Sequence, residues 1–138
     1  MHRHRLLAMD RDEVWRLVEA YRDAWVGHDL NGLLELVTPD VVFHNHTAAE
    51  RVEGAVGFGE HVAQIHARWP DTQFTERRVH LGEEFAVVEW TASARRTDGR
   101  QVEWDGIDVI ELRGARICAN YVYSSSHAPR MLDSDEPE

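Results

Sequence analysis

The chain has 138 residues, of which 43% are hydrophobic and 29% charged, a composition typical of a globular protein. This length predicts one domain with a hydrophobic core of its own. With 25 acidic and 15 basic side chains the formal charge is −10, which argues against nucleic acid as a partner. No apolar run approaches the roughly 20 residues that a membrane helix needs, so we also expect no membrane partner.

The two ends of the chain differ in composition from the rest. Residues 1–9 are expected to be a flexible N-terminus, because their apolar run is too short for a signal peptide. Residues 127–138 carry four closely spaced acids and are expected to be a disordered acidic tail. Residues 10–126 would then form the domain. A single cysteine, Cys118, excludes an intrachain disulfide and fits a cytoplasmic location.

Three helices are predicted in the first half of the chain. Asp10 and Glu13 resemble a capping box, and the helix that follows ends near Gly27. Its apolar stripe consists of Val14, Leu17, Val18, Tyr21 and Trp25. A short second helix begins at Asp29 and is broken by Pro39. The third runs from Gly54 to about Trp69, with Phe58, His61 or Val62, and Ile65 on its inward side.

Strands account for most of the remaining chain. A short one at residues 41–46 places Phe43 and Asn45 on one face and His44 and His46 on the other. A loop is expected from there to Glu53. Four more are predicted at 74–81, 85–95, 101–112 and 116–124, joined by turns so short that they require antiparallel hairpins. The fold class is therefore α+β: three N-terminal helices followed by a four-strand antiparallel meander.

The strand at residues 101–112 contains the most informative carboxylate. Side chains alternate along a strand, so Asp108 shares its face with Val102, Trp104, Gly106 and Ile110. If that face lines a pocket, partial desolvation raises the pKa of Asp108 and prepares it for acid–base catalysis. The alternative is an ion pair between Asp108 and an arginine across the sheet.

The order and spacing of these elements resemble the nuclear transport factor 2-like superfamily and its SnoaL-like group. The matching segments are 13–29 with Tyr21 inside, 40–45, 52–54, 106–110 and 114–117. This resemblance implies a cone-shaped, curved antiparallel sheet wrapped around helices, with an internal pocket. It also implies chemistry related to that of polyketide cyclases, ketosteroid isomerases or limonene epoxide hydrolases.

The resemblance suggests roles for individual residues. Tyr21 and Asp108 correspond to the oxyanion donors of ketosteroid isomerases. The proton-moving aspartate of those enzymes corresponds to Asn45, and an amide cannot take up a proton at neutral pH. The Arg-x-Asp element of the epoxide hydrolases has no counterpart in residues 89–92. In SnoaL-like cyclases an aspartate is the base, which implies Asp108 as the base with Tyr21 and Asn45 as donors.

The candidate site therefore has two groups of residues. The catalytic group is Asp108, Tyr21 and Asn45. The substrate-binding group is Trp25, Phe43, Phe58, His61, Trp104, Asn120, Val122 and Ser124. We expect no cofactor and no metal. The two-residue spacing of His44 and His46 can hold a metal, but we interpret these residues as surface or dimer-contact histidines.

Three functions remain open from the sequence. The first is a cofactor-free isomerase- or lyase-type enzyme acting on a hydrophobic, carbonyl-bearing or polyketide-like substrate. The second is a non-catalytic binder of a small apolar ligand. The third is a dimeric interaction module with a vestigial pocket. All three include a homodimer through the outer sheet face, which would cover Ile107 and Val109.

Overall fold

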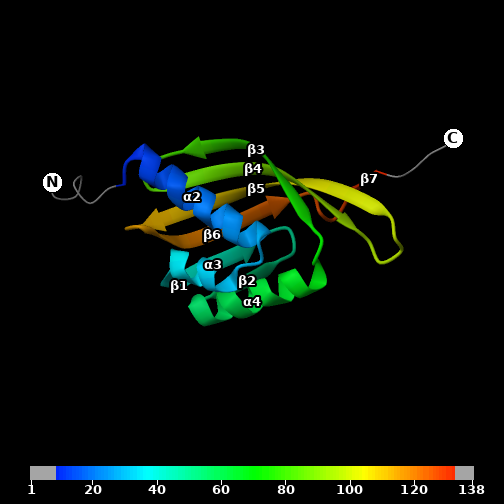
Figure 1. Ribbon diagram of the computed structural model, residues 1–138, viewed down its shortest axis with the longest axis horizontal. Helices are drawn as coiled ribbons and strands as arrows, with labels where there is room; N and C mark the ends of the chain where they lie inside the picture. Colours follow the sequence, from blue (N-terminus) through cyan, green and yellow to red (C-terminus); the bar gives the residue numbers. More distant parts are fainter. Residues whose placement is uncertain (1–8, 133–138) are drawn as a thin grey trace.

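The computed structural model describes residues 9–132 and has the expected α+β class (Figure 1). The helices lie on one side of a curved sheet, with α2 crossing the strands and α4 beside the β1–β2 edge. The helices are α2 (Arg11–Val26), α3 (Leu30–Leu36) and α4 (Ala55–Arg68). The strands are β1 (Val37–Asn45), β2 (Glu50–Glu53), β3 (Gln73–Leu81), β4 (Phe85–Arg95), β5 (Gln101–Arg113), β6 (Arg116–Ser124) and β7 (Arg130–Met131).

Local side-chain contacts explain where the first two helices begin. Asp10 accepts a hydrogen bond from the Glu13 amide at 2.8 Å, and the Glu13 carboxylate accepts one from the Asp10 amide at 2.9 Å. This pair is the reciprocal capping box that the sequence predicts. Asp29 caps α3 in the same way, through the Gly32 amide at 2.9 Å. These hydrogen bonds satisfy amide groups in the first turn of each helix and so fix where each helix begins.

The sheet has the order β2-β1-β6-β5-β4-β3, with β7 paired to β5. The antiparallel meander of β3 to β6 is as predicted. Two expectations were wrong. The segment before Glu53 contains β2, which pairs antiparallel with β1. In addition, β1 runs parallel to β6, so the sheet is mixed and not wholly antiparallel. The intervening helices and strands supply the long crossover that parallel pairing requires.

The register of the strands places residues far apart in sequence in rows across the inner face. One row contains Asn45, Val122, Asp108 and Val88, in that order from β1 to β4. The next row toward the start of β6 contains Phe43, Asn120, Ile110 and Ala86. Neighbouring rows are two residues apart along each strand, so all these side chains point to the same side.

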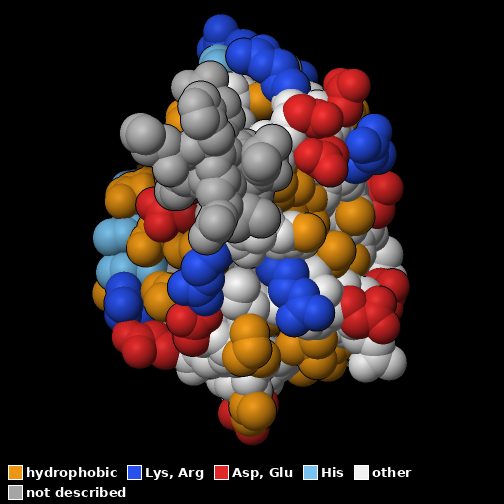
Figure 2. Space-filling view, turned by 90° about the vertical axis from the view of Figure 1, so that its left-hand side faces the viewer, with side chains coloured by type: hydrophobic (Ala, Val, Ile, Leu, Met, Phe, Trp, Pro, Cys, Tyr) orange, Lys and Arg blue, Asp and Glu red, His pale blue; other side chains and the backbone are white. Residues whose placement is uncertain are grey.

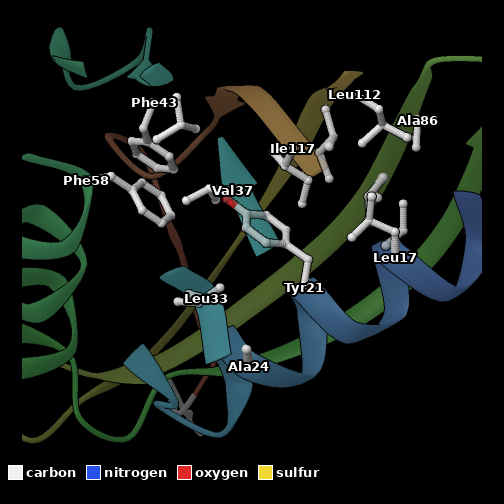
Figure 3. Close-up of a cluster of buried hydrophobic side chains, with 14 of the residues drawn as sticks. Leu17, Tyr21, Ala24, Leu33, Val37, Phe43, Phe58, Ala86, Leu112 and Ile117 are labelled. Carbon is white, nitrogen blue, oxygen red and sulfur yellow. The ribbon is translucent and has the colours of Figure 1, made fainter. Parts of the chain in front are cut away.

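The hydrophobic core fills one end of the space between the sheet and the helices (Figure 3). Val14, Leu33, Val41, Phe58 and Ile117 are fully buried there. Tyr21 rises from α2 into this cluster, with its hydroxyl directed away from the helix. The Phe43 ring from β1 and the Phe58 ring from α4 lie 6.0 Å apart in this cluster and join α4 to the sheet.

The segment after β6 is more ordered than the sequence suggests. Residues 127–132 belong to the expected tail, yet β7 pairs with β5 and Arg130 donates to the Glu103 carboxylate at 2.9 Å. The described part of the chain therefore continues beyond residue 126. Residues 1–8 and 133–138, which make up most of the expected flexible N-terminus and the end of the tail, lie outside the described residues.

The surface mixes both signs of charge. At the end of the molecule away from the tip of the β4–β5 hairpin, acidic and basic side chains lie side by side among hydrophobic ones (Figure 2). The net charge of −10 is thus not gathered into a single acidic patch on this face. None of the helices described is long and apolar enough to cross a membrane.

Candidate active site

A cavity of about 540 Å³ lies between the inner face of the sheet and helices α2 and α4. All three residues of the expected catalytic group line it, namely Asp108, Tyr21 and Asn45. Six residues of the expected substrate-binding group do so as well: Trp25, Phe43, Trp104, Asn120, Val122 and Ser124. These nine residues come from α2 and from strands β1, β5 and β6, so the cavity gathers distant segments of the chain around one carboxyl group.

Asp108 is the acid at the floor of this cavity. Its row neighbours are Val122 and Val88, and Ile110 follows it on the same face. Its side chain is partly exposed, and it lines the cavity. Desolvation by these surroundings raises the pKa of Asp108 from 3.8 to about 7. The alternative of an ion pair with an arginine is not what the structure shows: among residues 9–132, no cation pairs with Asp108.

Trp90 holds one oxygen of this carboxyl group. Its indole Nε1 donates to Asp108 Oδ1 at 3.1 Å, which favours the ionised form and partly opposes desolvation. Gly106 lies opposite Trp90 in the register of β4 and β5. A Cβ atom at Gly106 would lie 2.3 Å from the indole ring, so only glycine leaves room for Trp90 in this position.

Tyr21 and Asn120 form the second polar contact of the cavity. The Tyr21 hydroxyl donates to Asn120 Oδ1 at 2.7 Å, across a buried interface between α2 and β6. Burial raises the pKa of Tyr21 well above its ordinary value, and the nearby Asp108 carboxylate adds to this effect. The phenol is therefore protonated over the whole physiological range, and it donates its proton to Asn120.

Asn45 lies on the opposite side of Val122 from Asp108. Its Oδ1 accepts from the Ala48 amide at 3.1 Å, in the turn that follows β1. Among the described residues none accepts a hydrogen bond from its NH₂ group. The two neighbours of Val122 are thus a donor, Asn45, and an acid, Asp108, separated by two strand spacings of about 4.8 Å each.

Two residues of the expected binding group do not line the cavity. Phe58 is fully buried and packs against Trp25 and Phe43 behind the cavity wall. His61 is also buried, with its ring 5.4 Å from that of Phe43. Its Nε2 atom lies 3.6 Å from the nearest carboxylate oxygen of Glu50. Both residues support Phe43 and do not contact the space beside Asp108.

His44 and His46 point away from the cavity, as the alternation along β1 predicts. Their rings stack at 3.7 Å, and His46 also stacks on Tyr123 at 4.4 Å. In residues 9–132 there is no cluster of three or more His, Cys, Asp or Glu side chains that could hold a metal ion.

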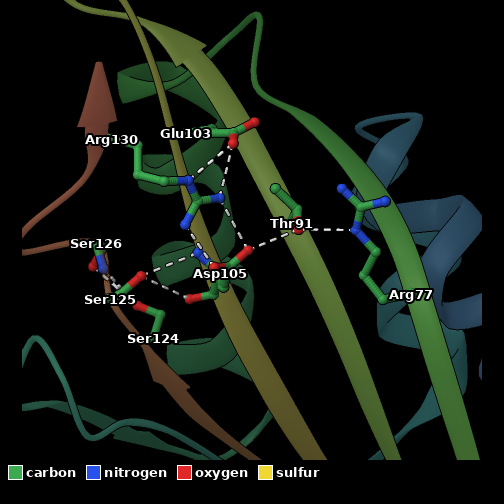
Figure 4. A network of polar contacts seen from close by, with 8 residues as sticks. All are labelled: Arg77, Thr91, Glu103, Asp105, Ser124, Ser125, Ser126 and Arg130. Atoms are coloured by element: carbon green, nitrogen blue, oxygen red, sulfur yellow. Dashed lines mark hydrogen bonds and ion pairs between the residues drawn. The ribbon is translucent and has the colours of Figure 1, made fainter. Parts of the chain in front are cut away.

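The outer face of β5 carries a second aspartate in very different surroundings (Figure 4). Arg130 binds both oxygens of Asp105, at 2.6 and 3.2 Å, and Thr91 donates to one of them at 2.8 Å. Arg77 in turn donates to Thr91 at 3.0 Å. Chiefly through the Arg130 hydrogen bonds, the pKa of Asp105 is held below its usual range.

A comparison of the sequence with models of protein families shows which family the chain belongs to. The model for the SnoaL-like domain matches residues 18–120, which is well over half of the sequence and includes Tyr21, Asn45, Asp108 and Asn120. The chain belongs to the SnoaL-like domain family.

Solved structures share the fold of this SnoaL-like domain. A protein assigned as a SnoaL-like polyketide cyclase from Jannaschia sp. CCS1 superposes with a TM-score of 0.78 at 16% identity, over 87% of this chain and 93% of that one. An epoxide hydrolase-like protein of M. tuberculosis gives 0.71 at 19% identity, with 84% and 85% covered. A protein assigned as a ketosteroid isomerase from Kribbella flavida gives 0.68 at 17%, with 92% and 83% covered.

These identities establish the fold and leave the activity open. No curated protein matches the sequence significantly. The function of this SnoaL-like domain therefore has to be argued from its own cavity.

The site of this SnoaL-like domain includes residues that the sequence pattern missed. The alternation along residues 85–95 does not by itself say which face carries Trp90, and the structure shows this residue as a hydrogen-bond partner of Asp108. The mouth of the cavity includes His28 and His66, whose rings stack at 3.8 Å, and Trp69, whose ring lies 6.0 Å from that of Trp104. Burial and the neighbouring His28 lower the pKa of His66. These contacts join segments far apart in sequence, so periodicity carries no signal for them.

Proposed function

We propose that this protein is a cofactor-free acid–base enzyme of the cyclase, isomerase or dehydratase type. Its substrate would be a small hydrophobic molecule that carries a carbonyl group. The observation that carries the proposal is a cavity-lining carboxyl group, Asp108, with a pKa of about 7 and a single neutral donor, Trp90, on one oxygen. Such a group takes up and releases protons near neutral pH.

The proposed reaction begins with the ionised form of Asp108. The carboxylate removes a proton from a carbon next to the carbonyl group, and the C–H electron pair moves to give an enolate with its charge on the carbonyl oxygen. Asp108 is then a neutral carboxylic acid. It returns the same proton to another carbon, to a leaving oxygen as its C–O bond breaks, or to the oxygen of a second carbonyl group whose carbon the enolate has attacked. Each of these transfers restores the carboxylate.

The row Asn45–Val122–Asp108 supports this proposal geometrically. The Asn45 NH₂ group faces the cavity side of β1, two strands from Asp108, so a ligand over Val122 can meet both groups. Asn45 would donate to the enolate oxygen while Asp108 holds the proton. Tyr21, which the family resemblance suggests as a donor, already directs its hydroxyl to Asn120 and would act through that residue.

Proton exchange on an aromatic ketone tests this function without knowledge of the natural substrate. 2-Tetralone in D₂O buffer is a suitable probe, because loss of its C1 protons is followed directly by ¹H NMR. We expect the wild-type protein to accelerate the exchange, and Asp108→Asn to lose about 100-fold or more of that acceleration. Asp105→Asn, on the outer face of the same strand, is the matched control and is expected to retain it.

The outcomes of this experiment separate the functions that the sequence left open. Binding of 2-tetralone with no exchange above that of Asp108→Asn would favour a non-catalytic binder and contradict the enzymatic proposal. Exchange that survives in Asp108→Asn would show that another group is the base.

We also propose a homodimer through the outer sheet face. Ile107 and Tyr123 pair across β5 and β6 and remain 36% and 44% exposed, so an interface on this face would bury them together. Sedimentation velocity should give twice the mass of the chain for the wild type and a single mass for Ile107→Glu. A wild-type monomer at high concentration would contradict this assembly.

A further inference from the structure

Asn120 lies between the Tyr21 hydroxyl and the Asp108 carboxyl group, the two groups of the cavity that can donate or exchange a proton. It comes from β6, where it pairs with Ile110, and it is the diagonal neighbour of Asp108 on the same face of the sheet. Diagonal neighbours are within reach of each other's side chains. Only 1% of Asn120 is exposed, so its amide is removed from solvent and contacts protein groups only.

The two ends of this amide have different surroundings. Its Oδ1 accepts the Tyr21 hydroxyl at 2.7 Å, while its Nδ2 has no hydrogen-bond partner among the described residues. A buried NH₂ group without a partner is costly and is rare in native proteins. Because the amide is planar and Oδ1 faces α2, Nδ2 faces away from Tyr21. The Asn120 amide also lowers the pKa of Asp108, which locates this free end on the carboxyl side.

We propose that Asn120 is a positioning residue that couples Tyr21 to Asp108. The Tyr21 hydroxyl donates its one proton to Asn120 Oδ1, so it holds the acceptor end of the amide and thereby directs the NH₂ end to the Asp108 carboxyl group. The NH₂ group then donates to the carboxylate when Asp108 has lost its proton. The importance of this coupling for catalysis rests on the proposed function. The coupling itself exists without substrate and can be tested separately.

Other charged groups that face the cavity are set apart from this contact. They are Arg22 from α2, His28, Glu50 from β2, His66 and Arg68 from α4, Glu76 from β3 and Arg96 after β4. Arg22 pairs with Glu76 at 3.0 Å, and among the described residues none of these groups pairs with Asp108. The neutral donors Trp90 and Asn120 are therefore the groups that set how far the carboxylate is stabilised.

The pKa of Asp108, measured by ¹³C NMR of the side-chain carboxyl groups, tests this coupling directly. Asn120→Leu replaces the amide by an apolar group of similar size, so the carboxylate loses a donor. We expect the pKa of Asp108 to rise by about one unit, the usual worth of a hydrogen bond to a charged group. In wild type the assignment of the Asp108 signal comes from its loss in Asp108→Asn.

Tyr21→Phe is the second, milder variant, because it removes one oxygen and keeps the ring in the core. With Oδ1 released, the amide can turn either end to Asp108, so the pKa of Asp108 should rise by less than in Asn120→Leu. In the double variant the two effects should not add, since Tyr21 acts on Asp108 through Asn120. A merely structural role for Tyr21 would instead give additive changes or none.

Tyr121→Phe is the matched control, because it deletes a hydroxyl from the adjacent position of β6 on the outer face. It should leave the pKa of Asp108 unchanged. The coupling would be overturned if Asn120→Leu and Tyr21→Phe both fold, as judged by circular dichroism, and both leave that pKa at its wild-type value. It would also be overturned if their effects added in full. Failure of the 2-tetralone assay alone would reject the proposed reaction and leave the coupling intact.

Discussion

Asp105 and Asp108 lie three residues apart on β5, on opposite faces of the sheet. Their carboxyl groups have different hydrogen-bond partners and opposite pKa shifts. Asp105, on the outer face, receives hydrogen bonds from Arg130 and Thr91, and its pKa is lowered. Asp108, on the inner face, lies among apolar side chains with one indole N–H on its carboxyl group, and its pKa rises to about 7. The face of the strand, and not the sequence motif around each residue, decides which carboxyl group can exchange protons near neutral pH.

The contrast has a simple electrostatic origin. A guanidinium group compensates the charge of Asp105 with two hydrogen bonds, so ionisation is favoured on the solvent side. Asp108 has no cationic partner among the described residues, and the cavity replaces water around it by Val88, Val122 and Ile110. Substitutions that remove the partners of either carboxyl group should therefore change the difference in pKa between Asp105 and Asp108.

The largest expected effect concerns stability against pH in Asp108→Asn. The folded state raises the pKa of Asp108 from 3.8 to about 7, so it binds this proton more tightly than the unfolded state. The resulting stabilisation is complete below pH 3.8 and is lost as the pH rises through 7. It amounts to about 4 kcal/mol. Urea unfolding should show this decline for wild type and a flatter profile for Asp108→Asn.

Asp105→Asn provides the opposite sign in the same experiment. The folded state lowers the pKa of Asp105, so its stabilisation is present above the unfolded pKa and lost as the pH falls through the folded one. The variant should be less stable than wild type at neutral pH and approach it in acid. If the unfolding free energies of Asp105→Asn and Asp108→Asn depended on pH in the same way, the two carboxyl groups would not have opposite pKa shifts.

Gly106→Ala should have the next largest effect. The new Cβ would lie 2.3 Å from the Trp90 ring, which must move and release its hydrogen bond to Asp108. We expect a loss of about 1–3 kcal/mol in the free energy of unfolding. Gly57→Ala is the matched control, since its Cβ meets nothing closer than 3.8 Å and alanine favours a helix interior. Equal stability of Gly106→Ala and wild type would show that Trp90 does not need this space.

Trp90→Phe keeps an aromatic ring on the cavity floor and removes only the donor. Because the N–H group favours the carboxylate, its loss should raise the pKa of Asp108 further, by about one unit. The pH dependence of 2-tetralone exchange should move upward by the same amount. An unchanged profile would mean that the indole contact does not stabilise the ionised acid.

Arg130→Gln should have the smallest effect, and it should change the pKa of Asp105 only. The pKa of Asp105 should rise toward its ordinary value, because Arg130 is the largest cause of its depression. The pKa of Asp108, across the sheet, should not change. A shift of both values in ¹³C NMR would indicate that the faces are electrostatically linked.

The sequence predicts much of this architecture because local signals repeat along it. The Asp10–Glu13 capping box, the helical stripe through Tyr21 and the alternation around Asp108 each depend on residues close together, and each corresponds to the observed element. The parallel pairing of β1 with β6 was missed because it joins residues about 80 positions apart. The strand β2, only four residues long, has no apolar alternation of its own and forms by pairing with β1.

The site was only partly accessible from sequence for the same reason. The place of Trp90 follows from the β4–β5 register, in which Arg95 pairs with Gln101 and Trp90 with Gly106. Counting back from that hairpin would have placed Trp90 on the face of Asp108. The bond between Tyr21 and Asn120 spans 99 positions and depends on how α2 packs over β6, which no periodicity encodes.

The most direct test of the account is a ¹³C NMR titration of the side-chain carboxyl groups in the wild-type protein. Asp108 and Asp105, assigned through their Asn variants, should titrate on opposite sides of 3.8, with Asp108 near 7 and Asp105 below. A midpoint for Asp108 at or below 4 would contradict the central claim, since the cavity would then not raise the pKa of this acid above its ordinary value.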